Sequence, residues 1–272
     1  MTSSTLPERS LTGIARRTLH AVGSLGGVVV VLLVVEVATR TDLLPSRFLP
    51  PPTETFAKLF ELLAGPTSWI AIGETLRSWA LGLAIAAAIG IALGLLVGSS
   101  ELAYRATRPL VEFLRPVPSV ALIPLVFLLF ADNLSGGTVF LAAFAALWPM
   151  LVQTTYGIRG VMPTQTETAK SFQIRPIDVA MRVVLPSAVP YIATGVRIAS
   201  TVSLILVLTG EIVVGAGGIG QQINDARQGS AVASMYAYVL LAGVLGVLLN
   251  AVFAAVERRL LRWHPSHREV VE

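Results

Sequence analysis

The sequence contains no cysteine, and only 13% of its 272 residues are charged. Without cysteine the chain has no disulfide, no thiolate metal site and no cysteine nucleophile. Its three histidines, His20, His264 and His267, lie near the chain ends without the spacing of a ligand set, so no metal site is expected. A phosphate-binding loop of the form GxxxxGKS/T is also missing. We therefore expect no ATP hydrolysis by the chain itself, and assign it no catalytic residue and no cofactor.

Apolar residues take the place of the missing charge and make up 54% of the chain. This fraction is too high for an ordinary soluble domain of this length and indicates an integral membrane protein. The formal net charge is +4. Its basic residues are not gathered into one patch with interleaved aromatic residues, so binding of nucleic acid is not expected.

Six apolar runs are long enough to cross a membrane, because about 30 Å of hydrocarbon takes roughly 20 helical residues. Backbone polar groups in lipid must be paired within their own segment, and the alternating pattern of a barrel strand is missing. The sequence therefore predicts an all-α fold, a polytopic membrane bundle of about six transmembrane helices. The expected spans are approximately Ala21–Ala38, Leu76–Val97, Leu110–Phe130, Val139–Ile158, Tyr191–Val214 and Ala233–Val256. The first is expected to be a retained anchor, because Glu36-Val37-Ala38-Thr39 is a poor signal-cleavage site.

The distribution of Lys and Arg predicts the orientation of the bundle. With both termini in the cytoplasm, only five of the 20 basic residues fall on the outer side: Arg40, Arg47, Lys58, Arg77 and Arg227. We expect a cytoplasmic tail over 1–20, a transmembrane domain over 21–258 and a second cytoplasmic tail over 259–272. The long loop at about 159–190 then faces the cytoplasm.

An amphipathic segment is expected outside the membrane, between the first two spans. Thr53 is expected to cap a helix there, which ends at Gly65-Pro66. This helix either packs on the edge of the bundle or contacts an incoming solute-binding protein. Its apolar face carries Phe56, Leu59, Phe60 and Leu63.

Gly215-Ala216-Gly217-Gly218-Ile219-Gly220 formally matches the dinucleotide fingerprint G-x-G-x-x-G. That motif requires a preceding strand and an acidic residue about 20 positions later, and neither is found here. We instead expect these glycines to let the chain turn and re-enter between helices before 221–227.

Ionisable residues inside apolar runs are costly and mark functional sites by default. The acids of this kind are Glu36, Glu112 and Glu211. Glu112 and Arg115 are three residues apart and are expected to neutralise each other, whereas Glu36 is expected to reach the outer interface. For each acid, structural pairing and lining of a pathway both remain open. Arg197 is a further ionisable candidate.

Prolines interrupt the third span at Pro116, Pro118 and Pro124. A proline removes a backbone donor, and the freed carbonyl must face protein or a water-lined cavity. The interruption is either part of a translocation path or a packing kink. The path candidates are Glu112, Arg115, Pro116, Pro118, Ser119 and Glu211.

The charged segment Glu167–Pro186 separates two long apolar runs on the cytoplasmic side. Phe172 and Ile174 are apolar residues between charges, a pattern typical of a surface that contacts a partner. The alternative is an ordinary solvated loop. We expect a short helix that carries Ala169 and Phe172 three positions apart to lie in a groove of the partner.

The order of residues in this segment resembles the cytoplasmic EAA loop of the membrane subunits of bacterial ABC importers. That pattern is Glu-Ala-Ala, three residues, Gly, nine residues, then Ile-x-Leu-Pro, and its final Leu-Pro coincides with the end of the segment. Thr168 and Val183 replace an Ala and the Ile of the pattern. Gln173 replaces the Gly, so the turn at this position must either avoid a positive φ or accept strain.

The resemblance extends over roughly Leu44 to His264 and is to permeases of the nitrate, sulfonate and taurine branch of ABC importers. The motifs that carry it are FLPPPTETF from Phe48, RPVPSVALIPLVF from Arg115, GEIVVGAGGIGQQINDAR from Gly210 and VERRLLRWH from Val256. After Phe127 the family commonly has Trp-Phe-Gly and an acidic turn, whereas this chain has LLFADNLSG.

The resemblance implies a multi-pass permease in the bacterial inner membrane, with a second copy of the chain, a cytoplasmic ATPase pair and an extracytoplasmic binding protein as partners. ATP bound by the partner would drive alternating access through the coupling residues. The implied solute is a small anion such as an aliphatic sulfonate, taurine or nitrate. Alternatives are a thiamine pyrimidine precursor, riboflavin, or, in a different class, a gradient-driven carrier. The implied coupling residues are Glu167, Thr168, Ala169, Ser171, Phe172, Gln173, Ile174 and Arg175.

Overall fold

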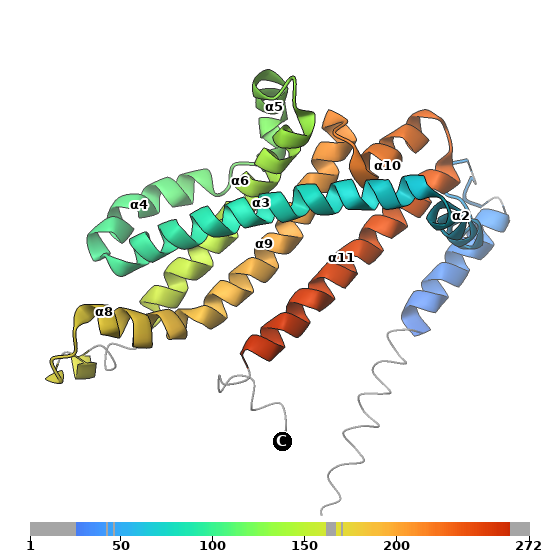
Figure 1. Ribbon diagram of the computed structural model, residues 1–272. Coiled ribbons are helices and arrows are strands. Elements are labelled where there is room, and N and C mark those ends of the chain that lie inside the picture. The colour runs from blue at the N-terminus through green and yellow to red at the C-terminus, as the bar shows by residue number, and fades with distance from the viewer. Residues whose placement is uncertain (1–25, 42, 46, 162–166, 170, 262–272) are drawn as a thin grey trace, which may run out of the picture.

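The computed structural model describes residues 26–41, 43–45, 47–161, 167–169 and 171–261. All regular structure in these ranges is helical, as expected (Figure 1). An unlabelled helix covers 26–40, and residues 167–169 and 171 are also helical. The other helices are α2 (Pro52–Ala64), α3 (Pro66–Ser99), α4 (Glu101–Leu114), the 3₁₀ turn η1 (Ser119–Leu122), α5 (Ile123–Leu129), α6 (Leu134–Arg159), α8 (Pro176–Val179), the π-helical turn η2 (Ala180–Val184), α9 (Leu185–Val214), α10 (Gly218–Gln228) and α11 (Val232–Leu260).

Four helical segments in the described ranges are long and apolar enough to cross a membrane: Pro66–Ser99, Leu134–Arg159, Pro176–Val214 and Val232–Leu260. They contain the second, fourth, fifth and sixth expected spans. Their lengths of 26 to 39 residues exceed the roughly 20 that a bilayer requires. The helices must therefore tilt in the membrane or extend beyond it.

The third expected span, Leu110–Phe130, is not one helix. It is a bent pair, Glu101–Leu114 and Ser119–Leu129, with an angle of 80° between the two parts. Pro116 and Pro118 lie in the break, where neither can donate a backbone hydrogen bond. The bent pair counts as a fifth crossing if both parts belong to one span.

The first expected span, Ala21–Ala38, begins outside the described residues. Its described part belongs to the helix over 26–40. The expected tails also lie outside the described residues, except for the short stretch 259–261. The three histidines fall outside them as well.

A line of small residues on α3 lets α6 approach closely. A Cβ built on any of four glycines of α3 would lie 2.5–2.8 Å from a Cβ of α6. Such a spacing is typical of packed membrane helices, where small residues four apart allow backbones to meet. Each pair below has the same offset along the chain, so α3 and α6 run parallel. The pairs are Gly82 with Ala142, Gly90 with Met150, Gly94 with Thr154 and Gly98 with Ile158.

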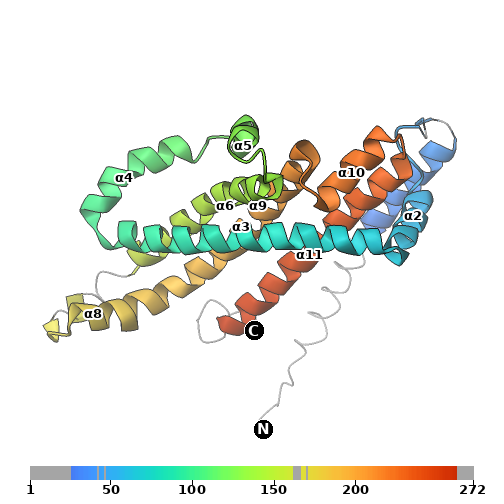
Figure 2. The same ribbon diagram turned by 45° about the horizontal axis from the view of Figure 1, so that its top comes forward.

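α3, α6 and α9 lie side by side and form the centre of the bundle, as both views show (Figure 1, Figure 2). Their shared core includes Leu83, Ala86, Ala146, Met150 and Ala199. α2 and α10 lie at one end of the bundle and α8 at the other. The two ends therefore carry different structures, and these provide the candidate sites.

The external helix α2 begins two residues earlier than expected, and Thr53 does not cap it with its side chain. Pro51 occupies the N-cap position without a side-chain hydrogen bond. The backbone N–H of Thr53 instead donates to a carboxylate oxygen of Glu36 at 3.0 Å, and its hydroxyl donates to the other oxygen at 2.8 Å. Glu36, which also pairs with Arg40, thus ties the first helix to α2.

Candidate functional site

The segment predicted to couple to an ATPase, which lies within 167–175, carries a short helical turn that ends in a left-handed residue. The N–H of Phe172 donates to the carbonyl of Thr168 at 3.1 Å, and the N–H of Ile174 donates to the carbonyl of Ala169 at 3.0 Å. This six-residue closure is the hydrogen bond of a Schellman motif, in which the residue before the donor has a positive φ. That residue is Gln173, with φ of +55°.

The geometry explains why the EAA pattern has Gly at this position. Glycine adopts a positive φ without steric cost, whereas an L-residue in this region loses roughly 1–2 kcal/mol. Of the two alternatives that the sequence left open, avoidance or strain, the structure has the strained one. Gln173 tolerates it better than a β-branched residue would.

The segment exposes an apolar surface. Phe172 is 76% exposed, and Ile174, Ile177 and Met181 are exposed beside it in the chain. Ala169, which was expected to share the contact face with Phe172, is buried at 5% exposure. The exposed apolar surface therefore continues from Phe172 towards α8, not back along the preceding turn.

A π-helical turn joins this segment to a membrane span. In the η2 turn, the N–H of Leu185 donates to the carbonyl of Ala180, five residues earlier. Pro186 follows, and a proline has no N–H and clashes with the carbonyl four residues before it, which favours a wider turn. Because α8, η2 and α9 form one segment of 39 residues, the helix that follows residues 167–175 is continuous with a span.

At the broken span, the expected pairing of Glu112 with Arg115 is wrong. Glu112 pairs with Arg108, one turn earlier on α4, with 2.7 Å between the carboxylate and Nε. Arg115 forms no ion pair with any residue that the structure describes. The unpaired guanidinium thus lies at the end of α4, just before the two prolines.

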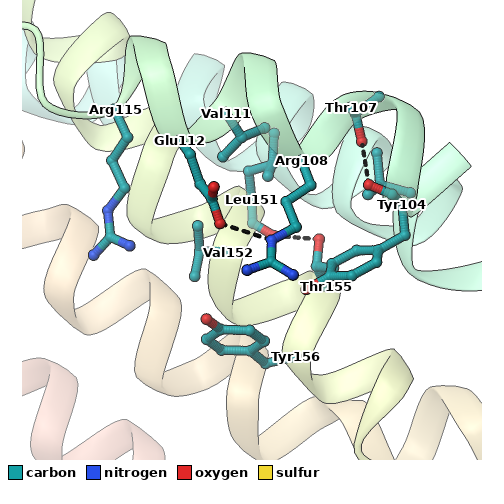
Figure 3. Close-up of a pocket in the computed structure, with 11 residues that line it drawn as sticks. Tyr104, Thr107, Arg108, Val111, Glu112, Arg115, Leu151, Val152, Thr155 and Tyr156 are labelled. Carbon is teal, nitrogen blue, oxygen red and sulfur yellow. Dashed lines mark hydrogen bonds and ion pairs between the residues drawn. The ribbon is translucent and has the colours of Figure 1, made fainter.

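Glu112 and Arg115 line one cavity of about 110 Å³ between α4 and α6 (Figure 3). Its floor contains the buried side chains of Leu151 and Thr155, and its rim contains the exposed phenol of Tyr156. The other lining residues are Val97, Tyr104, Thr107, Arg108, Val111 and Val152. Pro116, Pro118 and Ser119 lie in or directly after the break and do not line this cavity.

Glu211 lies apart from that cavity and is 1% exposed. One of its carboxylate oxygens accepts from the hydroxyl of Thr75 and from the N–H of Gly220, each at 2.9 Å. Two further N–H groups at the start of α10 donate to α3: Gly218 to Glu74 at 2.7 Å and Ile219 to Thr75 at 2.9 Å. Glu211 therefore helps to cap α10 and to join it to α3 and α9.

The glycine motif at the start of α10 is required by this arrangement. Gly217 and Gly218 have φ values of +86° and +80°, and a Cβ on Gly218 would overlap the carboxyl group of Glu211. This agrees with the expected turn and re-entry, since α10 packs against α3, α9 and α11.

The structure brings together some of the expected site residues and adds others. Glu112 and Arg115 meet at the cavity, whereas Glu211 is at the other end of the bundle. Arg197, the other ionisable candidate, contacts Glu257 at 3.5 Å and Asn250 at 3.1 Å, and so links α9 to α11. Sequence reasoning missed Arg108, Tyr156, Glu74 and Thr75. Only Arg108 left a signal, its spacing of four residues from Glu112.

Long apolar helices, a charged break in one span and an exposed apolar segment at one end define a multi-pass membrane protein. The chain belongs to the family of binding-protein-dependent transport system inner membrane components, whose pattern matches residues 64–262.

Curated relatives agree with this assignment. The chain is 32% identical over 190 residues to the nitrate import permease protein of Leptolyngbya laminosa, covering 70% of this chain and 68% of the relative. It is 35% identical over 195 residues to a bicarbonate transport permease of Synechococcus elongatus, with coverage of 71% and 69%. It is 29% identical over 249 residues to the taurine transport permease of Escherichia coli, with coverage of 89% of each chain.

Solved structures share the fold. An inward-facing form of the MetNI methionine ABC transporter matches with a TM-score of 0.62 at 18% identity, over 71% of this chain and 97% of that chain. An amino acid ABC transporter matches with a TM-score of 0.61 at 18% identity, over 75% and 97%. At this identity the match establishes the ABC-transporter membrane-domain fold alone.

The chain is therefore a permease subunit of a binding-protein-dependent ABC importer. It is a multi-pass, non-catalytic component of the inner membrane. A transporter of this class also contains an ATPase and a binding protein, as the sequence resemblance implied.

Proposed function

We propose that this chain forms, with a second copy of itself, the membrane path of an importer for a small oxyanion such as nitrate, bicarbonate, taurine or an aliphatic sulfonate. The observation that carries the substrate class is the charge around the broken span. Arg108 and Arg115 line the cavity there with a single carboxylate, Glu112. An excess of cations lowers the electrostatic barrier for an anion and raises it for a cation.

The names of relatives support the same class. The proteins at 29–35% identity are named as permeases for nitrate, bicarbonate and taurine, all of which carry an anionic group. In this chain we assign the path to the break in the third span, with Glu112, Arg115, Pro116, Pro118 and Ser119 as its residues. Irregular backbone at membrane depth is tolerated where it lines a water-filled cavity, which suits this assignment.

Glu211 receives a structural role in this proposal, not a place on the path. Its carboxylate is enclosed and already accepts two hydrogen bonds. It holds α10 against α3 on the side of the membrane that we assign to the exterior. The solute-binding protein would then contact α10 and α2 at this outer end of the bundle.

On the cytoplasmic side, we assign coupling to Glu167, Thr168, Ala169, Ser171, Phe172, Gln173, Ile174 and Arg175. An ATPase pair would bind the exposed apolar surface around Phe172 and move it as ATP closes the pair. Because α8, η2 and α9 are continuous, this motion would reach the membrane span directly. The path would open outward with ATP bound and return inward after hydrolysis. Both termini lie in the cytoplasm in this orientation.

Transport by the reconstituted complex tests the proposal. The full chain is co-purified with its ATPase and incorporated into proteoliposomes with the binding protein on the outer side. We expect uptake of at least one of nitrate, bicarbonate, taurine or methanesulfonate that requires ATP, the ATPase and the binding protein. Uptake of riboflavin or a pyrimidine without any uptake of oxyanions would contradict the substrate class. Uptake driven by an ion gradient, with the ATPase omitted, would contradict the coupling.

A further inference from the structure

The cavity between α4 and α6 has a polar rim that the path assignment does not explain in full. Arg108, Glu112 and Arg115 project from the same face of α4, since they are four and three residues apart. Figure 3 shows their charged ends on the side of α4 that faces α6, with Tyr156 opposite them. All four side chains line the same cavity, with Arg115 at one side of the other three.

The groups of this rim differ in whether they already have partners. Arg108 is held by Glu112 at 2.7 Å. Neither the guanidinium of Arg115 nor the hydroxyl of Tyr156 forms a hydrogen bond with any other residue in the described part of the chain. The rim therefore has free donors beside an ion pair that a competing anion can open.

Basic side chains outnumber acidic ones on and beside α4. Further along α4, Glu101 is shared between Arg105 and Arg159, with contacts of 2.6 Å to each. Arg159 also lies over the ring of Tyr104 at 3.9 Å and holds that side of the cavity. Arg105 and Arg159 thus share Glu101 outside the cavity, whereas the cavity itself has two guanidinium groups and one carboxylate, an arrangement that attracts small anions.

The volume of the cavity restricts the ligand. About 110 Å³ corresponds to roughly four water molecules at their volume in the liquid. An oxyanion of four or five non-hydrogen atoms fits such a space, whereas a bulky organic anion would have to extend out of it. A planar guanidinium matches the oxygens of such an anion in pairs, which a simple cation cannot do.

We propose that this cavity is a transient oxyanion site, in which Arg115, Arg108 and Tyr156 donate to the anion and Glu112 competes with it for Arg108. This inference rests on the proposed function and adds to it a binding site and a mechanism for release. An anion that enters takes Arg108 from Glu112. The carboxylate then repels the anion and regains the guanidinium as the anion leaves, so the site binds weakly enough to let its ligand pass.

The opposite effects of two neutral substitutions test this mechanism. Arg115→Gln removes a charge-assisted donor and should weaken anion binding by at least about tenfold. Glu112→Gln removes the competitor and should strengthen binding about threefold or more. Arg105→Gln is the matched control, because it removes a guanidinium from α4 outside the cavity and should change binding little. A purely structural role of the ion pair would instead make Glu112→Gln bind more weakly.

Binding is measured as thermal stabilisation of the permease–ATPase complex in phosphatidylcholine nanodiscs. Sodium nitrate and sodium methanesulfonate are titrated at constant ionic strength against sodium gluconate, which is too large for the cavity. We expect saturable stabilisation by both small anions, and none by the larger morpholinoethanesulfonate. Equal stabilisation by the large and small sulfonates, or no change of affinity in either variant, would overturn the inference.

A second arm excludes a lipid headgroup as the occupant. The same complex is prepared in nanodiscs with and without phosphatidylglycerol. We expect the affinity for nitrate to be nearly the same in both. If phosphatidylglycerol alone stabilises the wild type, Arg115→Gln removes that effect and soluble anions have none, the site binds lipid and the inference is wrong.

Uptake by the wild-type complex separates this inference from the proposed function. ATP-dependent oxyanion uptake with unchanged anion affinity in the Glu112→Gln and Arg115→Gln complexes would contradict the inference alone. A wild-type complex that imports no oxyanion would contradict the proposed substrate class, whatever the cavity binds.

Discussion

At the scale of single residues, a few side chains hold conformations or partners that the rest of the structure imposes on them. Gln173 adopts a left-handed conformation because the turn before it closes through Ile174. Glu211 is buried because the first N–H groups of α10 require acceptors. In each case the backbone determines what the side chain must do.

The strain at Gln173 predicts opposite effects of two substitutions. Gln173→Gly removes the steric cost of a positive φ, in part offset by the greater freedom of glycine when the turn is open, whereas Gln173→Val increases that cost. Amide hydrogen exchange of the segment 167–175 should slow by about two- to fivefold in the Gly variant, which corresponds to roughly 0.5–1 kcal/mol. It should become faster in the Val variant.

Exchange in α10 serves as the control, because that helix lies at the other end of the bundle and should not respond. Faster exchange of the segment in Gln173→Gly than in the wild type would contradict the left-handed assignment.

Sequence patterns identified some of these residues but not their partners. The sequence predicted that Glu112 is neutralised on its own helix, and it is. However, Arg115 at three residues and Arg108 at four residues are equally available by spacing, and the sequence alone favoured the wrong one. Glu74 and Thr75 contact α10 across 144 positions in the chain. Local spacing carries no information about a contact of that kind.

At the scale of helices, the bundle is organised by close approach along α3. Its glycines face α6 at intervals of four or eight residues, and each leaves room for one side chain of the neighbour. Lipid gives little hydrophobic driving force for helix association, so contact area and close packing must supply it.

Two equivalent substitutions on α3 should therefore affect the free energy of unfolding differently. A Cβ on Gly94 would lie 2.5 Å from the Cβ of Thr154, whereas a Cβ on Gly73 would have no neighbour within 4 Å. Gly94→Ala should destabilise the chain by about 1–3 kcal/mol through overpacking. Gly73→Ala should leave stability unchanged or raise it by up to about 1 kcal/mol, because alanine favours the helix.

Unfolding by SDS in mixed micelles, followed by tryptophan fluorescence, measures both effects. If the two variants shift the unfolding midpoint in the same direction by the same amount, close contact between α3 and α6 at Gly94 is not what stabilises the bundle.

Hydrophobic runs predicted the helices of this bundle better than their bends. Runs of about 20 apolar residues located α3, α6, α9 and α11, because lipid permits little but a helix there. In the third run the prolines were visible in the sequence. The 80° angle was not, since a proline can kink a helix without turning it so far, and the direction depends on the contacts of α5 with α6.

At the scale of the whole molecule, the two ends of the bundle differ. At one end α10 is held in place by hydrogen bonds, and at the other end an apolar surface is exposed. α10 is held by hydrogen bonds to α3 and α9, whereas the segment around Phe172 is exposed. α9 connects the two ends, as it begins after the π turn next to the coupling segment and carries Glu211 near its far end. α9 thus forms a continuous helical connection between the two ends.

The family resemblance, more than the composition, gave the function. Composition and charge distribution indicated a membrane bundle and an orientation, but they did not distinguish an ATP-driven importer from a gradient-driven carrier. The register of the segment from Glu167 to Pro186 did so, because it is specific to one class of permease. The family match over 64–262 confirms the importer assignment.

The most direct test of the central claim, that a separate ATPase drives this permease through the segment around Phe172, is the effect of Phe172→Asp on ATP-dependent uptake and on co-purification of the ATPase. A charge in an apolar contact is costly, so both should fall by at least about tenfold. Phe60→Asp on α2 is the control, since Phe60 is exposed to 70% and lies at the other end of the bundle, and ATPase co-purification should be unaffected. A Phe172→Asp complex that retains its ATPase and imports at the wild-type rate would contradict the account.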